Sequence, residues 1–366
     1  MRYRILCLTL ALAFCPLPSR AADDALTTEL RVLATDFAKI INKQGGGAVA
    51  VGEFSASSDL KASAGARIQL TLVAELQALK LTVNPEDYRF EIKGDYQPLV
   101  DKETSLLGIK VVGRLIDRET GEPLAEKPTG RFVFGAETVP QMAGLNVHGT
   151  PTTDPIALSE KFKEARKAPD THLQGSRIST APGCPFAIEI LVKTPSGYMP
   201  KAVALEKGLP FAPLNPNDIY AVRLINDAPH ETAVDLRIDG VNCFEFTNVG
   251  NGKSKPAFWI LKPKSQLDVL GWHMNNEKSL EFKVVVDFSE TAAAKLNLKP
   301  SATIGLITAS FSASWSDDSQ RPADEPLLMG RGSGFGSEIS VKTEQVVRTI
   351  GLPRDTISVR YERNGQ

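Results

Sequence analysis

The residue types that most often carry out chemistry are few in this sequence, and they stand at no recognisable spacing. Four histidines are present: His148, His172, His230 and His273. None lies in the H-E-x-x-H pattern that sets two zinc ligands on one helix face, and no two are close enough in sequence to predict paired ligands. We expect the first three on the solvated surface, because they fall in or beside a Gly- and Pro-rich stretch or in a turn. The sequence therefore predicts no catalytic residue and no metal ligand.

Motifs for nucleophiles, phosphates and calcium are not matched either. The Gly-rich run 330–336 has the composition of G-x-S-x-G but the wrong spacing, and no helix pattern follows it. Gly45–Gly47 lacks the Lys and the Ser or Thr of a phosphate-binding loop. The acidic pairs Asp317-Asp318 and Asp324-Glu325 do not form the D-x-[DN]-x-[DN]-G run of a calcium loop. We interpret all of these as turns and loops, and we expect no cofactor.

The segment around Trp272 is the surface feature that most suggests a ligand. Trp272, His273, Asn275 and Asn276 bring together an aromatic ring, an imidazole and two amides. In a loop between strands, such groups can hold a polar ligand or a protein partner. The alternative is that Trp272 packs into the core and the remainder is an ordinary polar turn. We favour the second interpretation and keep the first as a possible partner or ligand loop.

The first 21 residues have the three parts of a secretory signal peptide. Arg2 and Arg4 precede the apolar run Ile5–Phe14, and small residues lead up to a cleavage position after Ala21. A lipoprotein is less favoured, because Cys15 follows a bulky Phe and precedes a Pro. No other apolar run approaches the roughly 20 residues that span a membrane as a helix. We expect an exported protein, periplasmic or at the cell surface.

Export makes the remaining cysteines candidates for a disulfide. Loss of the signal peptide removes Cys7 and Cys15 and leaves Cys184 and Cys243. An oxidising compartment allows any pair that folding brings together to form a bridge. This bridge would close a loop of about 60 residues and stabilise the fold by roughly 4 kcal/mol. Two buried free cysteines are the alternative, and both outcomes stay open.

Composition indicates a folded chain of two domains. The 366 residues carry 42 Lys and Arg against 43 Asp and Glu, and 42% are hydrophobic. That hydrophobic share argues against disorder, and the near-zero net charge offers no field for a phosphate backbone. We therefore expect no nucleic-acid partner. At roughly 100–200 residues per domain, the length favours two domains.

The first half has the pattern of a small α/β sandwich domain, over residues 22–135. Apolar residues recur at helical spacing over 25–43 and 63–80, and Gly45–Gly47 ends the first of these helices. Short apolar or alternating runs predict the strands, which are residues 48–51, 81–83, 88–92, 106–116 and 131–134.

The order of these elements resembles a group of bacterial envelope domains. The residues that carry the resemblance are Ala48–Phe54, the helix 63–80, Ile92–Tyr96 and Val111–Asp117 followed by Thr120-Gly121. They are similar to the α/β domain of the curli secretion channel, the amino-terminal domain of the Tol–Pal propeller protein, and outer-membrane activators of peptidoglycan synthases. The resemblance implies a domain that assembles or binds partners and is not known for catalysis.

The rest of the chain predicts a linker and an antiparallel β-sandwich. Residues 136–183 are rich in Gly, Pro, Thr and Ser with one short charged helix at Ile156–Lys167, and we interpret them as a linker. Residues 184–362 contain many short alternating runs broken by Gly, Pro and Asn, and a short helix capped by Ser289. They resemble a poorly characterised exported β-sandwich module. Residues 363–366 are a tail. The fold class expected is α+β.

These observations favour a non-catalytic role in the cell envelope. We expect an adaptor or binding module whose partner is an envelope protein or a cell-wall component. One alternative is an exported hydrolase that uses scattered Asp, Glu or Ser residues. The other is a carbohydrate-binding protein, which would need at least two of Trp259, Trp272 and Trp315 exposed together.

Overall fold

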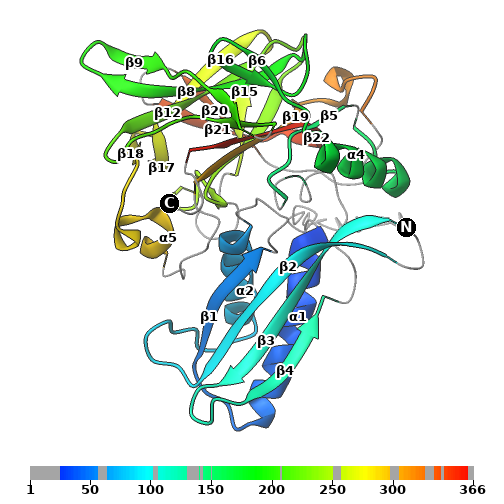
Figure 1. Ribbon diagram of the computed structural model, residues 1–366, viewed down its shortest axis with the longest axis vertical. Helices are drawn as coiled ribbons and strands as arrows, with labels where there is room; N and C mark the ends of the chain where they lie inside the picture. The colour runs from blue at the N-terminus through cyan, green and yellow to red at the C-terminus, as the bar shows by residue number, and fades with distance from the viewer. Residues whose placement is uncertain are drawn as a thin grey trace, which may run out of the picture.

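The computed structural model shows a mixed α+β protein with mostly strands, in several sheets, and few helices (Figure 1). It describes residues 25–56, 64–101, 106–129, 140, 143–149, 151–206, 208–249, 257–296, 305–325, 334–338 and 342–361. The expected signal peptide and the tail 363–366 lie outside these residues. Among the helices described, none combines the length and apolar character that a membrane crossing requires.

The N-terminal unit is a four-stranded sheet with two helices on one face (Figure 1). The strand order is β1-β2-β3-β4, with β1 parallel to β2 and the other pairs antiparallel. The helix expected over 25–43 is confirmed in full. The elements are α1 (Ala25–Lys43), β1 (Val49–Ala56), α2 (Gly65–Ala78), β2 (Phe90–Val100), β3 (Leu107–Asp117) and β4 (Pro123–Pro128).

Close approach of α1 to the sheet depends on a glycine in β3. Phe37 of α1 is fully buried, and a Cβ at Gly113 would lie 2.9 Å from its ring. Gly94 of β2 is the register partner of Gly113, and a Cβ at Gly94 would collide with the Val112 carbonyl. Arg31 of α1 then joins Glu75 of α2 through two hydrogen bonds of 3.0 Å. The helices are thus held to the sheet by packing and to each other by a half-buried ion pair.

The C-terminal unit consists of two larger sheets that share one buried core. The ten-stranded sheet contains β5 (Val147–His148), β10 (Ala204–Glu206), β11 (Leu209–Phe211), β13 (Thr232–Ile238), β14 (Val241–Asn242), β15 (Trp259–Leu261), β19 (Leu306–Trp315), β20 (Gly334–Glu338), β21 (Lys342–Val346) and β22 (Thr349–Arg360). The eight-stranded sheet contains β6 (His172–Gln174), β7 (Arg177–Ser179), β8 (Phe186–Thr194), β9 (Gly197–Pro200), β12 (Ile219–Asn226), β16 (Ser265–Val269), β17 (Gly271–Asn275) and β18 (Lys278–Lys283).

Alternation along the strands builds that shared core. Val234 on β13 pairs with Phe311 on β19, and the Phe311 ring stacks 5.2 Å from the ring of Phe186 on β8 of the other sheet. All three side chains are at most 2% exposed. Burial of each aromatic ring stabilises the fold by roughly 1.5–3 kcal/mol. Side chains from both sheets therefore meet in one apolar layer.

The interpretation of residues 136–183 as a linker was wrong for its described part. The charged helix expected there is α4 (Pro155–Lys167), but its face of Leu158, Phe162 and Ala165 is buried and belongs to the core of the N-terminal unit. These residues follow at spacings of four and three, which puts them on one side of a helix. The same stretch supplies β5, β6 and β7 to the two larger sheets. The described part of residues 136–183 is therefore packed into both units and does not act as a free spacer between them.

One smaller expectation was wrong, and another falls outside the described residues. The short helix with Ser289 as its N-cap is instead a 3-10 turn, η1 (Phe288–Glu290), followed by α5 (Ala292–Lys295). Its N-cap is Thr291, whose hydroxyl accepts a hydrogen bond from the Ala294 N–H. The fourth strand of the first sheet is β4, whereas the strand expected at 131–134 lies outside the described residues.

Candidate functional site

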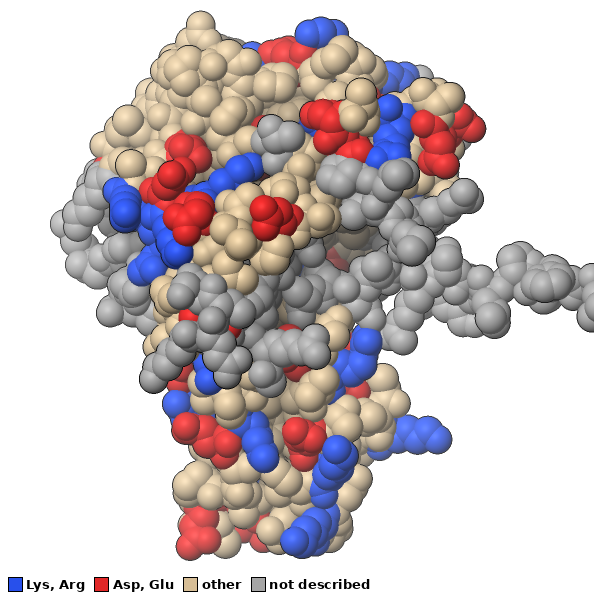
Figure 2. All heavy atoms as spheres, turned by 90° about the vertical axis from the view of Figure 1, so that its right-hand side faces the viewer, with Lys and Arg blue, Asp and Glu red and all other residues tan. Residues whose placement is uncertain are grey.

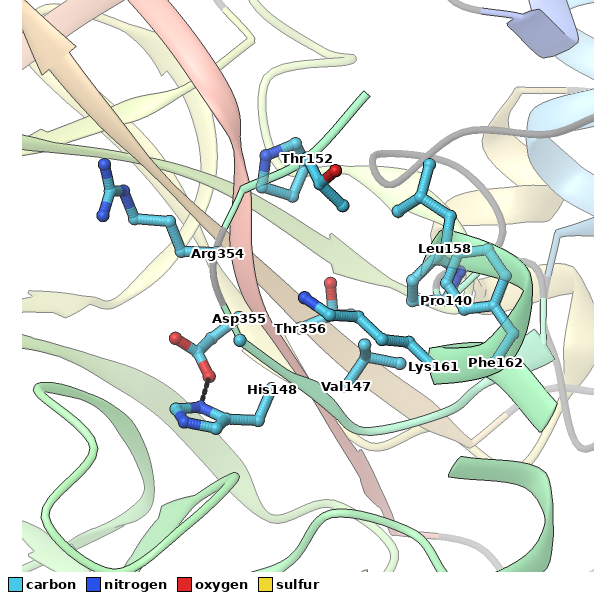
Figure 3. Close-up of a pocket in the computed structure, with 12 residues that line it drawn as sticks. Pro140, Val147, His148, Thr152, Leu158, Lys161, Phe162, Arg354, Asp355 and Thr356 are labelled. Carbon is cyan, nitrogen blue, oxygen red and sulfur yellow. Dashed lines mark hydrogen bonds and ion pairs between the residues drawn. The ribbon is translucent and has the colours of Figure 1, made fainter. Parts of the chain in front are cut away.

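A small recess lies where α4 meets β5 and β22 (Figure 3). Phe162 and Lys161 border it from α4, His148 from β5, and Asp355 from β22. Its free space fits a water molecule or an ion and is too small for an organic substrate. In Figure 3 the Lys161 side chain extends from α4 across the recess toward β22.

His148 and Asp355 form a hydrogen-bonded pair at the border of this recess. His148 Nδ1 lies 2.7 Å from Asp355 Oδ1, and the two residues are register partners on β5 and β22. The His148 side chain is 43% exposed, whereas the Asp355 side chain is 3% exposed. The hydrogen bond and the negative charge of Asp355, with a further contribution from Asp170, raise the pKa of His148 against the opposing effect of burial. A proton at Nδ1 is therefore shared with a buried carboxylate.

Thr180 and Cys184 complete the group from the segment between β7 and β8. The Thr180 hydroxyl donates to Asp355 Oδ1, and its oxygen lies 3.1 Å from His148 Nδ1 and 3.4 Å from Cys184 Sγ. Cys184 Sγ also accepts a weak hydrogen bond from the Phe186 N–H at 3.4 Å. One hydroxyl thus stands among a nitrogen, an oxygen and a sulfur. We refer to His148, Thr180, Cys184 and Asp355 as the recess cluster.

A β-bulge directs Asp355 into this cluster. Along the β19–β22 ladder Phe311 pairs with Asp355 and Ser312 with Pro353, which leaves Arg354 as an extra residue. Such an insertion bends a strand and re-aims the side chains beside it. Arg354 is turned to the other side, where Asp324 accepts from its guanidinium.

The chemistry of Cys184 argues against a nucleophilic role. Burial raises the pKa of the Cys184 thiol, and the negative charge of Asp355 raises it further. Nucleophilic attack requires the thiolate, which catalytic cysteines obtain from positive surroundings. His148 Nδ1 is engaged by Asp355 rather than set to take the proton of the thiol. The recess cluster is suited to holding a proton or a small cation.

The four residues of this cluster come from distant parts of the sequence, so their spacing could not reveal them. His148 was expected on the solvated surface, and it is exposed there. Its pairing with Asp355 was not expected, because it depends on β5 lying beside β22. His172 on β6 is half-buried. His230 is a turn residue whose Nδ1 lies 3.0 Å from the Glu231 carbonyl. Neither joins the recess cluster.

The possible ligand loop at Trp272–Asn276 is largely packed. His273 is 2% exposed on β17, with Nδ1 3.0 Å from the Thr247 hydroxyl. Trp272 meets the rings of Phe246 and Phe282 edge-on, both at 5.3 Å. The Asn275 side chain accepts from the Glu277 N–H, as in an ordinary turn, and Asn276 follows it there. Trp272 thus packs against the core, as the favoured interpretation has it. His273 is a buried strand residue rather than part of a polar turn.

The other tryptophans do not form a sugar-binding platform. Trp259 is 6% exposed and Trp315 is 4% exposed. A platform would need at least two indole faces in water together, and Trp272 is itself covered on two sides. Of the acidic pairs, Asp317 caps the 3-10 turn η2 (Asp318–Gln320), and Asp324 with Glu325 binds Arg354. The two acidic pairs thus take part in a turn cap and in ion pairs.

The candidate disulfide between Cys184 and Cys243 is not formed, and both cysteines are buried free thiols, which was the alternative. Cys184 belongs to the recess cluster beside edge strand β5. Cys243 lies behind β13, where its N–H donates to the Leu236 carbonyl and its carbonyl accepts from His273. The sequence could not decide between the two outcomes because strand order, which it does not encode locally, sets where the two thiols lie in the core.

Comparison of the whole chain with protein-family models, with curated proteins and with solved structures finds no match.

Proposed function

We propose that this protein is an exported, non-catalytic binding protein of the cell envelope, an adaptor built from an α/β domain and a β-sandwich domain. The observation that carries the proposal is the open face of the four-stranded sheet. Helices α1 and α2 both lie on one face, and no described helix covers the other (Figure 1). One face of a largely antiparallel sheet can stay in water, and such a face is a surface that a partner can cover.

The open face has the mixed chemistry of a protein–protein interface. Arg114 of β3 bridges Asp95 of β2 at 2.8 Å and Glu126 of β4 at 2.7 Å. Val112 and Ile116 are half-buried beside it on the same strand. Surface ion pairs of this kind stabilise a fold by only about 0–1 kcal/mol, so their groups can be exchanged for those of a partner at little cost. Aliphatic side chains beside an Arg suit the core of such an interface.

Charge distribution and the N-terminal segment are consistent with the proposed setting. On the side shown in Figure 2, Lys and Arg lie interspersed with Asp and Glu rather than in a patch of one sign. That pattern favours a protein or cell-wall partner over a nucleic acid. The residues before Ala21 have the features of a signal peptide, which supports an envelope location.

A pair of valines provides the test. A photo-crosslinking residue at Val112 samples the open face, and the same residue at Val32, which is 49% exposed on α1, samples the helical side. In producing cells we expect Val112 to give one discrete adduct with an envelope protein or with cell wall, and Val32 to give none. Arg114→Glu should abolish the adduct. Equal adducts from both valines, or none from Val112, would contradict the proposal.

A further inference from the structure

We propose that His148, Cys184 and Asp355 form a binding site for one divalent transition-metal ion, and that Zn²⁺ is the ion their ligand atoms fit best. Within the described parts of the chain, this is the group of three ligating side chains whose donor atoms all lie within 4.8 Å of one another. The site is additional to the proposed partner surface and does not depend on it.

The separations of the donor atoms are close to those of a zinc site. Zn–S bonds of about 2.3 Å and Zn–N or Zn–O bonds of about 2.0–2.2 Å place tetrahedral ligand atoms roughly 3.3–3.7 Å apart. His148 Nδ1 and Asp355 Oδ1, now 2.7 Å apart in a hydrogen bond, would have to separate, and the thiol would have to approach them. Movements on the order of 1 Å are within the reach of side-chain torsions at a half-exposed His.

The donor set selects the kind of metal. An imidazole, a thiolate and a carboxylate suit a borderline-soft ion, whereas Mg²⁺ and Ca²⁺ prefer oxygen alone. Three protein ligands leave one tetrahedral position for water or for a ligand from a partner. The side chain of His148 is 43% exposed, so the site can be reached from solvent.

Groups around the three ligands have the roles of supporting shells in metal sites. The Phe186 N–H points to Cys184 Sγ at 3.4 Å, an interaction that stabilises a thiolate. The backbone N–H of His148 donates to Asp170 Oδ2 at 3.0 Å, and this hydrogen bond holds β5 in place. The Thr180 hydroxyl stands among the three donor atoms. Without metal, this hydroxyl gives the three donor atoms a hydrogen-bonding partner. When the ion binds, the hydrogen bond from Thr180 to Asp355 must break.

Binding is balanced by release of protons. The S–H bond of Cys184 breaks as the Zn–S bond forms, and that proton passes to solvent. When His148 is protonated, Nδ1 loses its proton as well, while Asp355 binds as the carboxylate it already is. Up to two protons leave per ion, so affinity increases with pH. Lys161, which extends across the recess, adds a positive charge that opposes the ion, and its long side chain can turn toward solvent.

Bound metal would join three separate segments of the fold. His148 lies on β5, Asp355 on β22 of the same sheet, and Cys184 immediately before β8 of the other sheet. An ion that binds the folded protein and not the unfolded chain raises stability by mass action. We therefore expect saturating Zn²⁺ to raise the melting temperature.

Cobalt titration of the purified, reduced protein tests the site directly. We expect one equivalent of Co²⁺ to give the visible bands of tetrahedral cobalt and a near-ultraviolet thiolate-to-cobalt band, and Zn²⁺ to displace it. Cys184→Ser should lose the thiolate band, and His148→Gln should weaken binding at least tenfold. The matched controls Cys243→Ser and His230→Gln should keep both stoichiometry and spectrum.

Other results would overturn the proposal. They are the absence of stoichiometric binding, a thiolate band that survives in Cys184→Ser, or a band that is lost in Cys243→Ser. Because His148 is half-exposed, His148→Gln is expected to fold, and circular dichroism checks this. Unchanged cobalt affinity in that folded variant would also exclude the site.

Discussion

Two histidines of this protein, His148 in the recess and His273 in the core, show how different surroundings move one side chain in opposite directions. His148 is half-exposed and shares a proton with a buried carboxylate, so its pKa is raised. His273 is 2% exposed and has the neutral hydroxyl of Thr247 as its partner, and burial lowers its pKa to about 4. A charged partner therefore decides the first case, and loss of water the second.

The two histidines also differ in role, because His273 packs the core whereas His148 is placed to bind. The ring of His273 lies 4.9 Å from that of Phe244 and 5.9 Å from that of Trp259, so it fills core volume as an aromatic residue would. His148 fills little volume and instead faces a recess that a small ion can enter. Near neutral pH one histidine serves the core, and the other is available to bind.

Deleting the two rings should give the largest difference. His273→Ala removes a ring from the packed core and one of the hydrogen bonds of the Thr247 hydroxyl, which should lower the free energy of unfolding by roughly 2–4 kcal/mol. His148→Ala should cost less, about 1 kcal/mol, because its ring is half in water and Asp355 keeps the hydrogen bond from Thr180. Urea unfolding of both variants measures the difference. Similar losses in the two variants would remove the distinction between core and recess.

Acidification should change the contributions of His273 and His148 to stability in opposite directions. His273 stays neutral when folded while the unfolded chain takes up a proton below about pH 6.5, so its contribution falls as the pH drops toward 4. Between pH 7 and 4.5 the free energy of unfolding should fall by roughly 2–3 kcal/mol more in the wild type than in His273→Gln. For His148 the raised folded pKa gives stability that is complete below about pH 6.5 and lost as pH rises through the folded value.

The corresponding control uses His148→Gln. Relative to that variant, wild type should gain stability as the pH falls from 8 to 6. Histidine ring-proton titration by NMR gives the two pKa values independently. A value for His273 above that for His148 would reverse the comparison.

Periodic packing could be predicted from the sequence, and convergence of distant segments could not. The helix Ala25–Lys43 and the strand Leu107–Asp117 follow from local apolar spacing, which the sequence displays directly. Helix α4 was expected, but its burial was not, because that depends on the unit it packs against. The recess cluster needs the pairing of β5 with β22, two elements separated by more than half the chain. Sequence spacing carries no record of such a contact.

The hydroxyls beside the two histidines offer a finer test. Thr180 donates to the carboxylate of Asp355, whereas Thr247 meets a neutral imidazole. Hydrogen bonds to charged groups contribute about 1.5–3 kcal/mol and neutral ones about 0.5–1.5 kcal/mol. Thr180→Val should therefore lower the free energy of unfolding by about 1 kcal/mol more than Thr247→Val. A larger loss in Thr247→Val would mean that the recess cluster is held together by other contacts.

The smallest effect concerns the two thiols, one in each environment. Cys184 is 7% exposed beside Thr180, and Cys243 is fully buried beside His273. A local opening of the structure suffices to expose a side chain near the surface, whereas a core side chain becomes exposed only in a larger and rarer opening. In the native protein a thiol reagent should thus modify Cys184 several-fold faster than Cys243, and Zn²⁺ should slow Cys184 alone. After denaturation without reductant both thiols should react, because no bridge joins them. Faster labelling of Cys243, or fewer than two thiols in the denatured protein, would contradict this assignment, and mass spectrometry of the labelled peptides distinguishes these results.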